Sequence, residues 1–273
     1  MEAQSGSFFA RNEFLIRRLH SLTGLVPVGA FMCVHLITNS STLGGAEMFQ
    51  KNVDLIHSLG PALPAVEWAF IFLPLIFHAV VGVWIIRSGE SNYFTYNYVS
   101  NFRWWMQRVT AWIALFFILY HVFHMHGWFH TEWWLKNVAN ENTGGHLFKP
   151  EHATSSAAIA LASPFKKLLY VVGVTACVFH LANGLWTLGI TWGIWTSPAA
   201  QRRANYLCAA FGVGLLAVGL GSIVGVSKTN VAEAEAFENA QLETKAAAAK
   251  RAAELLKKES AKAVTPTATA TKK

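Results

Sequence analysis

Charged side chains are scarce in this sequence: they account for 14% of its 273 residues, whereas hydrophobic residues account for 53%. A typical soluble domain has about 25% charged residues, so the composition argues against a soluble catalytic domain. The sequence also has no Gly-rich phosphate-binding loop, and its cysteines form neither a CxxC nor a CxxCH motif. A disulfide framework and covalent haem attachment are therefore unsupported. The three cysteines lie in apolar segments, where we expect them to pack as small residues: Cys33, Cys177 and Cys208.

The hydrophobic residues gather in five segments, each long enough for a membrane-crossing helix, which takes about 20 residues. A helix is the expected form, because lipid offers no partner to an unpaired backbone amide. The first segment follows Arg17 and Arg18 and lacks a clear small-residue cleavage site, so we interpret it as a retained helix and not as a signal peptide. We predict an all-α membrane protein in which five transmembrane helices form a bundle, at about 19–39, 66–87, 107–128, 168–194 and 205–227.

The net charge of +7 could indicate a nucleic-acid-binding protein, but the arginines are distributed as in a membrane protein. Cytoplasmic loops carry an excess of basic residues, so we place the N-terminus in the cytoplasm and the C-terminal tail outside, and we expect no nucleic acid partner. The long third connection, about 129–166, also carries lysines, although it is predicted to lie on the opposite side of the membrane. The rule is weaker for long loops, so these lysines do not decide the orientation. The arginines of the predicted cytoplasmic side are Arg11, Arg17, Arg18, Arg87, Arg103, Arg108, Arg202 and Arg203.

The composition changes after the fifth predicted helix. Residues 228–273 are rich in Ala, Glu and Lys, and 232–262 contains strong helix formers with Glu–Lys neighbours at helical spacing. The last residues, around Pro266, are typical of disorder. We therefore divide the chain into a membrane domain, 1–227, and a charged tail, 228–273, which we interpret as a solvated appendage, partly helical or disordered.

Four of the eleven histidines place one imidazole in each of the first four predicted helices: His35, His78, His121 and His180. An ionisable side chain within a membrane is costly and is a functional candidate. A single such histidine can simply bond to a neighbouring helix, but four on four helices weaken that interpretation. Bis-histidine ligation of haem takes one histidine from each of two helices and suits electron transfer, so the pattern predicts two haems. Gly82 and Gly184, each four residues after a histidine, leave room for a flat group.

The distance from the nearest arginine sorts these histidines by depth. His35 lies 35 − 18 = 17 residues beyond Arg18, and His121 lies 121 − 108 = 13 residues beyond Arg108. At about 1.5 Å per residue, both belong in the outer half of the membrane. His78 lies 87 − 78 = 9 residues before Arg87, which puts it in the inner half.

His180 is near the middle of the fourth helix, so depth does not place it, and it pairs with His78 by elimination. The third helix leaves an ambiguity, because His124 lies about 60° around the helix from His121. Spacing favours His121 as the partner of His35. A metal cluster of His121, His124 and His126 is the rival interpretation, with no cysteine or carboxylate nearby to complete it.

Several stretches carry a family resemblance: "RRLHSLTGLVPVGAFMCVHL", "FLPLIFHAVVGVW", "QRVTAWIALFFILYHV" and "FHLANGLWTLGITWG". In this order they resemble the di-haem cytochrome b membrane-anchor subunit of succinate dehydrogenases and fumarate reductases, and most of all the five-helix form found with menaquinone in bacteria. The resemblance covers about 11–227. It implies two noncovalent haems b, quinone as substrate, and the bacterial cytoplasmic membrane as the location.

The resemblance assigns His35 and His121 as axial ligands of a distal, outer haem, and His78 and His180 as those of a proximal, inner one. This agrees with the depth argument and favours His121 over His124. His20 and Ser21 match a polar pair that in the family approaches the proximal haem's propionates, and Trp104, at the approach to the third helix, is a further candidate for such a contact. The alternative for His20 is an interfacial residue.

The implied reaction is succinate oxidation to fumarate coupled to quinone reduction, or its reverse, with no dicarboxylate site on this chain. Electrons would pass from the iron–sulfur partner through the proximal and distal haems to quinone near the outer face. The implied partners are a flavoprotein subunit, an iron–sulfur subunit, membrane lipid and menaquinone, in a complex compatible with a higher oligomer. Glu67 is the candidate for quinone-linked proton exchange; alternatively, it is a helix-start acid stabilised by the helix dipole.

Two other classes of protein compete with this interpretation. One is the cytochrome b subunit of another quinone-linked oxidoreductase, such as a hydrogenase, a formate dehydrogenase or a bc-type complex. The bc-type carries two ligands on each of two helices, which does not match one histidine on each of four helices. The other is a haem-free transporter with a histidine relay, which predicts no visible absorption.

Overall fold

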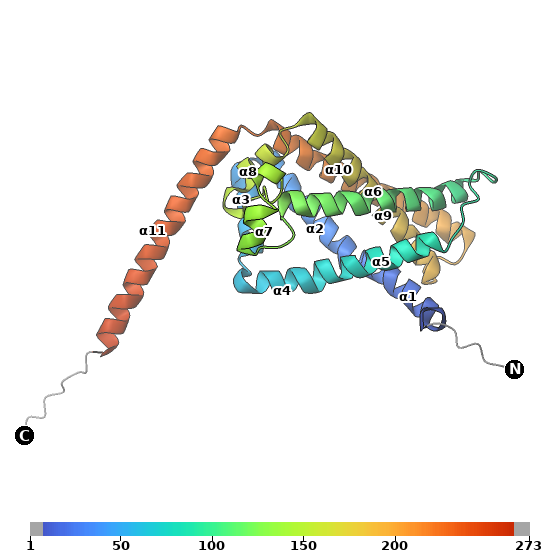
Figure 1. Ribbon diagram of the computed structural model, residues 1–273, viewed down its shortest axis with the longest axis horizontal. Helices are drawn as coiled ribbons and strands as arrows, with labels where there is room; N and C mark the ends of the chain where they lie inside the picture. The colour runs from blue at the N-terminus through green and yellow to red at the C-terminus, as the bar shows by residue number, and fades with distance from the viewer. Residues whose placement is uncertain (1–7, 265–273) are drawn as a thin grey trace, which may run out of the picture.

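The structure, a computed structural model, describes residues 8–264. Within this range the chain is helical and has no strand, and five segments are long and apolar enough to cross a membrane. They lie side by side as a bundle (Figure 1). The predicted all-α fold is confirmed, and each predicted helix overlaps one of these segments: Arg11–Gly44, Gly60–Arg87, Val99–Met125, Pro164–Thr191 and Pro198–Lys228.

The first two membrane spans are interrupted helices. The first consists of α1 (Phe8–Leu25) and α2 (Val28–Ser40), with the break at Pro27, whose nitrogen has no hydrogen to donate. The second contains one π-helical turn, in which the Leu73 amide reaches back to the Trp68 carbonyl. Pro74 follows this turn and cannot make the α-type bond, so the wider turn is accommodated there. The elements of the second span are η2 (Gly60–Ala62), α4 (Leu63–Glu67), the π turn η3 (Trp68–Phe72) and α5 (Leu73–Arg87).

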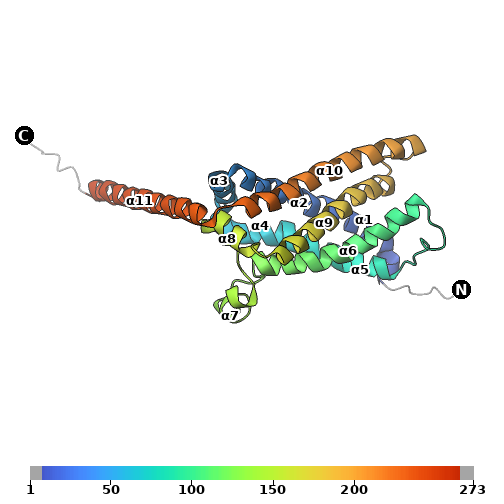
Figure 2. The ribbon, with the colours of Figure 1, turned by 90° about the horizontal axis from the view of Figure 1, so that it is seen from above.

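The other three spans are the unbroken helices α6 (Val99–Met125), α9 (Pro164–Thr191) and α10 (Pro198–Lys228). Both α9 and α10 begin with a Ser–Pro pair, which suits a helix start because proline at the first position gives up only an amide that would be unpaired. α9 packs against both α6 and α10 (Figure 2). The core of this three-helix contact contains Phe117, Val174, Val178, Leu181 and Leu215.

The connections after the first and third spans fold into a layer at one end of the bundle, on the left in Figure 1. This outer layer consists of η1 (Ser41–Gly44), α3 (Ala46–His57), α7 (Glu132–Asn137), η4 (Glu141–Thr143), η5 (Pro150–His152) and α8 (Ala153–Ala160). The last span ends at the same side, as an odd number of crossings requires. The start of the C-terminal helix α11 (Val231–Val264) packs on α8 and α3.

The C-terminal tail is not simply the solvated appendage that the composition predicts. At the start of α11, Ala234 and Glu238 are buried, and Lys245 forms an ion pair with Asp54 of α3 at 2.6 Å. That part of the prediction is wrong, because a few docked side chains are enough to attach a helix of polar composition. Residues 246–260 are exposed, and the helix projects from the bundle there (Figure 1). The expected disorder around Pro266 lies outside the described residues.

Candidate functional site

Two of the predicted histidines, the predicted inner pair, face each other between α5 and α9. The rings of His78, on α5, and His180, on α9, have centroids 6.1 Å apart and an interplanar angle of 87°. His78 Nδ1 lies 2.9 Å from the carbonyl oxygen of His20, and His180 Nδ1 lies 3.2 Å from the carbonyl oxygen of Gln107. A carbonyl only accepts, so each Nδ1 carries the proton and donates it. Each Nε2 then keeps a lone pair, which is the form that binds a metal.

A chain of side-chain hydrogen bonds fixes the surroundings of His180. The Gln107 amide nitrogen lies 3.2 Å from the His180 carbonyl oxygen and 3.4 Å from His180 Nε2. The Gln107 oxygen accepts from Asn183 at 2.7 Å, and the Asn183 oxygen accepts from Arg103 at 2.9 Å. These contacts join α6 to α9 beside the ring, so they hold the imidazole in one orientation.

The other two predicted histidines, the predicted outer pair, meet between α2 and α6. His35, on α2, and His121, on α6, have ring centroids 5.8 Å apart with an interplanar angle of 74°. His121 Nδ1 lies 3.2 Å from the hydroxyl of Tyr170, and the His121 ring is stacked on Phe117. The two pairs are those that the depth argument predicts, His35 with His121 and His78 with His180.

The remaining histidines of the third span have other surroundings. His124 is buried, its ring is stacked on Tyr120, and its Nδ1 lies 2.8 Å from the Tyr170 hydroxyl. His126 lies just beyond the span, beside His130. Burial, together with His130 and His146, lowers the pKa of His126 to about 4, so its ring is neutral near pH 7. Among the described residues, no three His, Cys, Asp or Glu side chains converge as a bare metal site, so the rival metal cluster gains no support.

The donor set of each pair fits a haem iron held by two histidines. A metal–imidazole bond is about 2 Å long, so two such bonds in line put the ring centroids about 6 Å apart. The observed separations of 6.1 and 5.8 Å match that spacing. Two neutral imidazoles with no third protein ligand suit a flat macrocycle that supplies the other four donors itself.

Small residues beside the histidines keep these positions open. A Cβ atom at Gly24, on α1, would lie 2.3 Å from His78 Cε1, so any side chain there would displace the ring. At the predicted Gly82, a Cβ would lie 3.2 Å from His20 Cε1, which is a tight contact. At the predicted Gly184, it would lie 3.6 Å from Gln107 Nε2, an ordinary contact distance, so space alone does not require glycine there. Gly24 was not among the predicted residues. The signal was present, because "HSLTG" repeats the four-residue spacing of "HAVVG" and "HLANG".

The three residues expected near propionates differ in their contacts. The His20 ring is stacked on His78 at 4.0 Å, and its Nδ1 is buried without a partner in the part of the chain that the structure describes. Ser21 Oγ donates to the Arg18 carbonyl at 2.9 Å and accepts from Trp192 at 3.1 Å, and Trp104 lies against the guanidinium of Arg108. Of the three, only His20 has a buried side-chain nitrogen without a partner among the described residues, and in the tautomer that protonates it this nitrogen could bond to an acidic group.

Glu67, the expected proton-exchange residue, belongs to neither histidine pair. It is half-buried and ends α4, directly before the π turn. The helical segment begins at Gly60, so Glu67 lies beyond the first turn, where the dipole effect has faded. Glu67 is therefore not at the start of its helix, and the alternative of a helix-start acid is wrong. Glu67 lies within electrostatic range of His130 and His57 at the outer end.

The chain was compared with known proteins. No family model matches it. It is 38% identical over 211 residues to the succinate dehydrogenase cytochrome b558 subunit of Bacillus subtilis (strain 168), and the match covers 77% of this chain and 96% of that protein. This identity extends over nearly the whole relative, and the chain has five helices long and apolar enough to cross a membrane. The similarity therefore shows the family and not only the fold. The chain belongs to the family of succinate dehydrogenase cytochrome b subunits.

Proposed function

We propose that this chain is the membrane-anchor cytochrome b subunit of a succinate:quinone oxidoreductase and that it holds two haems b between histidine pairs. The observation that carries the proposal is the arrangement of four imidazoles as two facing pairs at two depths, on four spans. When bound, the haems would supply one-electron redox centres between the two membrane faces.

The residues of the chain would serve these centres in distinct ways. The carbonyls of His20 and Gln107 hold the inner imidazoles in the tautomer that binds iron. Tyr170 takes the corresponding place for His121. The apolar spans exclude water from both pairs, so water would not compete for their free nitrogens. The Gln107 amide nitrogen, 3.4 Å from His180 Nε2, would turn aside when that nitrogen binds iron.

The two ends of the bundle would meet different partners. We propose that the inner, arginine-rich end faces the cytoplasm and binds an iron–sulfur subunit and, with it, a flavoprotein that carries the dicarboxylate site. Opposite charge between two surfaces favours docking and orients it. Quinone, proposed to be menaquinone, would react near the outer pair, with Glu67 as the candidate for proton exchange.

Haem stoichiometry tests the proposal directly. The complex is purified in mild detergent, and haem b is measured per chain as the pyridine haemochrome. Two haems b per chain are expected. No haem, with no absorbance change on dithionite reduction, would instead favour the histidine-relay transporter, which needs no visible chromophore.

A further inference from the structure

A cavity of about 520 Å³ lies between the outer layer and the helices α10 and α11. Its wall contains Leu43 and Lys228, at the ends of the first and fifth membrane spans. The starts of α3 and α11 also line it, because the chain turns from α10 into α11 beside α3 and α8 (Figure 1). Small-molecule sites are commonly cavities of about 300–1,000 Å³. The cavity therefore has the size of a ligand site, and it lies where two spans leave the hydrocarbon, at the level of lipid headgroups.

Charged side chains of both signs line this cavity. They are Lys228 at the end of α10, Glu47 in the first turn of α3 and Glu233 in the first turn of α11. None of them takes part in the ion pairs formed within the described residues. Each sign suits its own helix end, because a helix N-terminus favours anions and a C-terminus favours cations. That effect does not bring the three together, and one cavity with both signs of unpaired charge suits a ligand that also carries both.

A hydroxyl in the wall adds an unused hydrogen-bond donor to these charges. Thr154 lines the cavity and is 1% exposed, and its Oγ1 makes no hydrogen bond within residues 8–264. Thr42, also in the wall, is different, because it already donates to the carbonyls of Asn39 and Ser222. Gly45, the N-cap of α3, has no side chain to accept from the first amides of that helix. A phosphate group accepts from both kinds of donor, a hydroxyl and the amides of a helix N-terminus.

Exposed apolar side chains continue from the cavity onto the membrane spans. Leu43, in the wall, is 59% exposed, and Val224, one turn before Lys228 on α10, is 44% exposed. A Cβ atom at Gly221 would lie 3.3 Å from Leu43 Cδ1, so the ends of the two spans are in close contact here. Exposed apolar side chains of a membrane span face acyl chains. A ligand with a polar head in the cavity and apolar chains therefore matches both surfaces.

We propose that this cavity binds the headgroup of a phospholipid with a primary amine, such as phosphatidylethanolamine. The phosphate pairs with Lys228 and accepts a hydrogen bond from Thr154, and a charge-assisted bond of this kind is strong. The ammonium lies between Glu47 and Glu233, and the acyl chains follow Leu43 into the membrane. The lipid then joins the ends of two spans to the start of the tail. Glycerophosphoethanolamine has the same head chemistry without chains, so the experiment separates a lipid from a soluble ligand.

The test is a lipid titration of the purified, delipidated complex, with bound lipid counted by native mass spectrometry. Dioleoyl phosphatidylethanolamine, dioleoyl phosphatidylglycerol and glycerophosphoethanolamine are added separately. Lys228→Gln and Thr154→Val are each expected to weaken binding of the first phosphatidylethanolamine by about tenfold, through loss of one bond to the phosphate. Glu47→Gln with Glu233→Gln should remove the preference for phosphatidylethanolamine over phosphatidylglycerol. The matched control is Lys51→Gln, which removes an exposed charge from α3 outside the cavity and should bind as wild type does.

Each result either supports or overturns the proposal. Weaker binding in Lys228→Gln and Thr154→Val, with none in Lys51→Gln, supports the site, and loss of the lipid preference in the double glutamine variant supports recognition of the amine. Equal binding of the two phospholipids by the wild type overturns that recognition. Binding of glycerophosphoethanolamine as tight as that of the lipid identifies a soluble ligand and overturns the lipid. If Thr154→Val fails to fold, Lys228→Gln decides alone, because Lys228 is exposed, and unchanged binding in it overturns the site.

Discussion

His78 shows how the chain would prepare a single side chain for the proposed haem iron. Its ring is held from three directions: His20 lies parallel to it, the His20 carbonyl accepts from its Nδ1, and Gly24 lets α1 approach. Each contact restricts the ring without using Nε2. An imidazole at the centre of an apolar membrane span suits this role, since burial and a fixed tautomer together leave one free nitrogen.

The pairing of histidines predicts which substitutions remove the same haem. His78→Ala and His180→Ala should each leave one haem b per chain, the outer one, because a single imidazole holds a noncovalent haem poorly. His35→Ala or His121→Ala should leave the inner one. Pyridine haemochrome and redox difference spectra of the purified variants measure both the amount and the identity. His124→Ala is the control and should retain two haems, since the His124 ring is stacked on Tyr120 and it is His121 that faces His35. If His78→Ala and His180→Ala depleted different haems, the pairing would be wrong.

The close approach of Gly24 gives a second test at this scale. Gly24→Ala places a methyl group 2.3 Å from the present position of His78 Cε1. The ring must then move, although its Nδ1 is bonded to the same helix, so we expect depletion or a spectral change of the inner haem alone. Gly214→Ala is the matched control, because a Cβ on that α10 glycine meets nothing within 4 Å. An unchanged inner-haem spectrum in Gly24→Ala would show that the ring has another position available.

The sequence predicts these residues unevenly, for physical reasons. Charged and polar side chains within a membrane are costly, so the four histidines stand out in the sequence. Their orienting partners do not, because two are backbone carbonyls that every residue carries. Tyr170 was missed because its hydroxyl matters only once α9 packs on α6.

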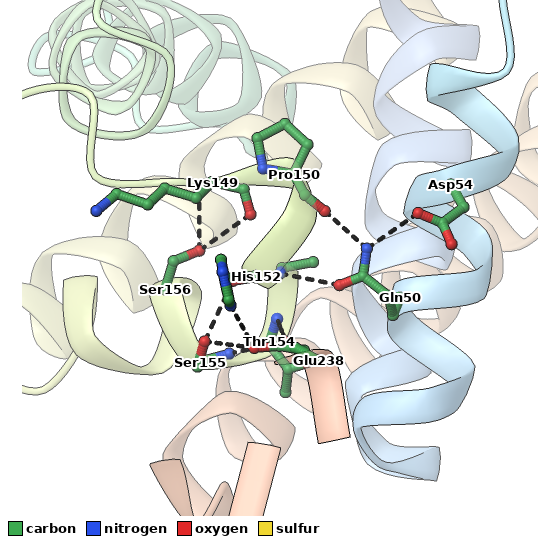
Figure 3. A network of polar contacts seen from close by, with 10 residues as sticks. Gln50, Asp54, Lys149, Pro150, His152, Thr154, Ser155, Ser156 and Glu238 are labelled. Atoms are coloured by element: carbon green, nitrogen blue, oxygen red, sulfur yellow. Dashed lines mark hydrogen bonds and ion pairs between the residues drawn. The ribbon is translucent and has the colours of Figure 1, made fainter. Parts of the chain in front are cut away.

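At the scale of elements, helix α8 is completed by two other helices. Its own N-cap, His152, makes no side-chain cap bond. Instead Glu238 of α11 accepts from the amides of Thr154 and Ser155 at 2.7 and 3.3 Å, and Gln50 of α3 accepts from that of Ala153 at 3.1 Å (Figure 3). A carboxylate at a helix N-terminus is also favoured by the helix dipole. The start of the tail therefore fastens the outer layer.

Removing this cap should loosen α8. Glu238→Ala leaves buried amides without an acceptor, which costs about 1–3 kcal/mol. Hydrogen exchange of 153–160, measured by mass spectrometry on the detergent-solubilised complex, should accelerate about tenfold to hundredfold. Glu254→Ala, on the exposed part of the same helix, should leave it unchanged. Equal protection in both variants would mean that water replaces the carboxylate without loss.

Truncation separates the two parts of the tail. A chain ending at 246 keeps Glu238 and the Lys245–Asp54 ion pair, so its outer layer and haem content should match those of the full chain. A chain ending at 228 lacks both contacts and should show faster proteolysis within 129–163. Limited proteolysis of the two chains side by side is the measurement. Identical digestion patterns would restore the interpretation of the whole tail as an appendage.

The existence and the order of the helices were predictable from the apolar segments, whereas the residues at which the helices begin and end were not. Helix α1 extends toward the N-terminus past the apolar stretch, through residues that include polar ones. It therefore begins at Phe8 and not near residue 19. The π turn in the second span depends on Pro74 and on packing. The docked tail escaped prediction because its attachment depends on Glu238, which looks like any surface acid in the sequence.

For the whole molecule, the two ends differ in chemistry. One end carries the arginines that precede or follow spans, and the other carries the folded outer layer and the tail (Figures 1 and 2). Partnered arginines such as Arg17 and Arg103 serve the bundle itself. Exposed ones such as Arg202 and Arg203, at the start of α10, are free to face a soluble partner.

This division predicts where charge reversal affects assembly. Arg202→Glu with Arg203→Glu should weaken binding of the iron–sulfur and flavoprotein subunits by about tenfold, because like charges then oppose docking. Haem content should remain at two per chain, since neither residue lies near a histidine pair. Co-purification in mild detergent at about 0.15 M and about 1 M salt measures the effect, and wild-type binding should also weaken at the higher salt, where charges are screened beyond about 3 Å. Lys250→Glu with Arg251→Glu reverses two exposed charges on α11, at the other end, and should leave co-purification intact. If the α11 pair released the soluble subunits and the α10 pair did not, the soluble subunits would bind at the outer end, and the proposed orientation of the chain would be reversed.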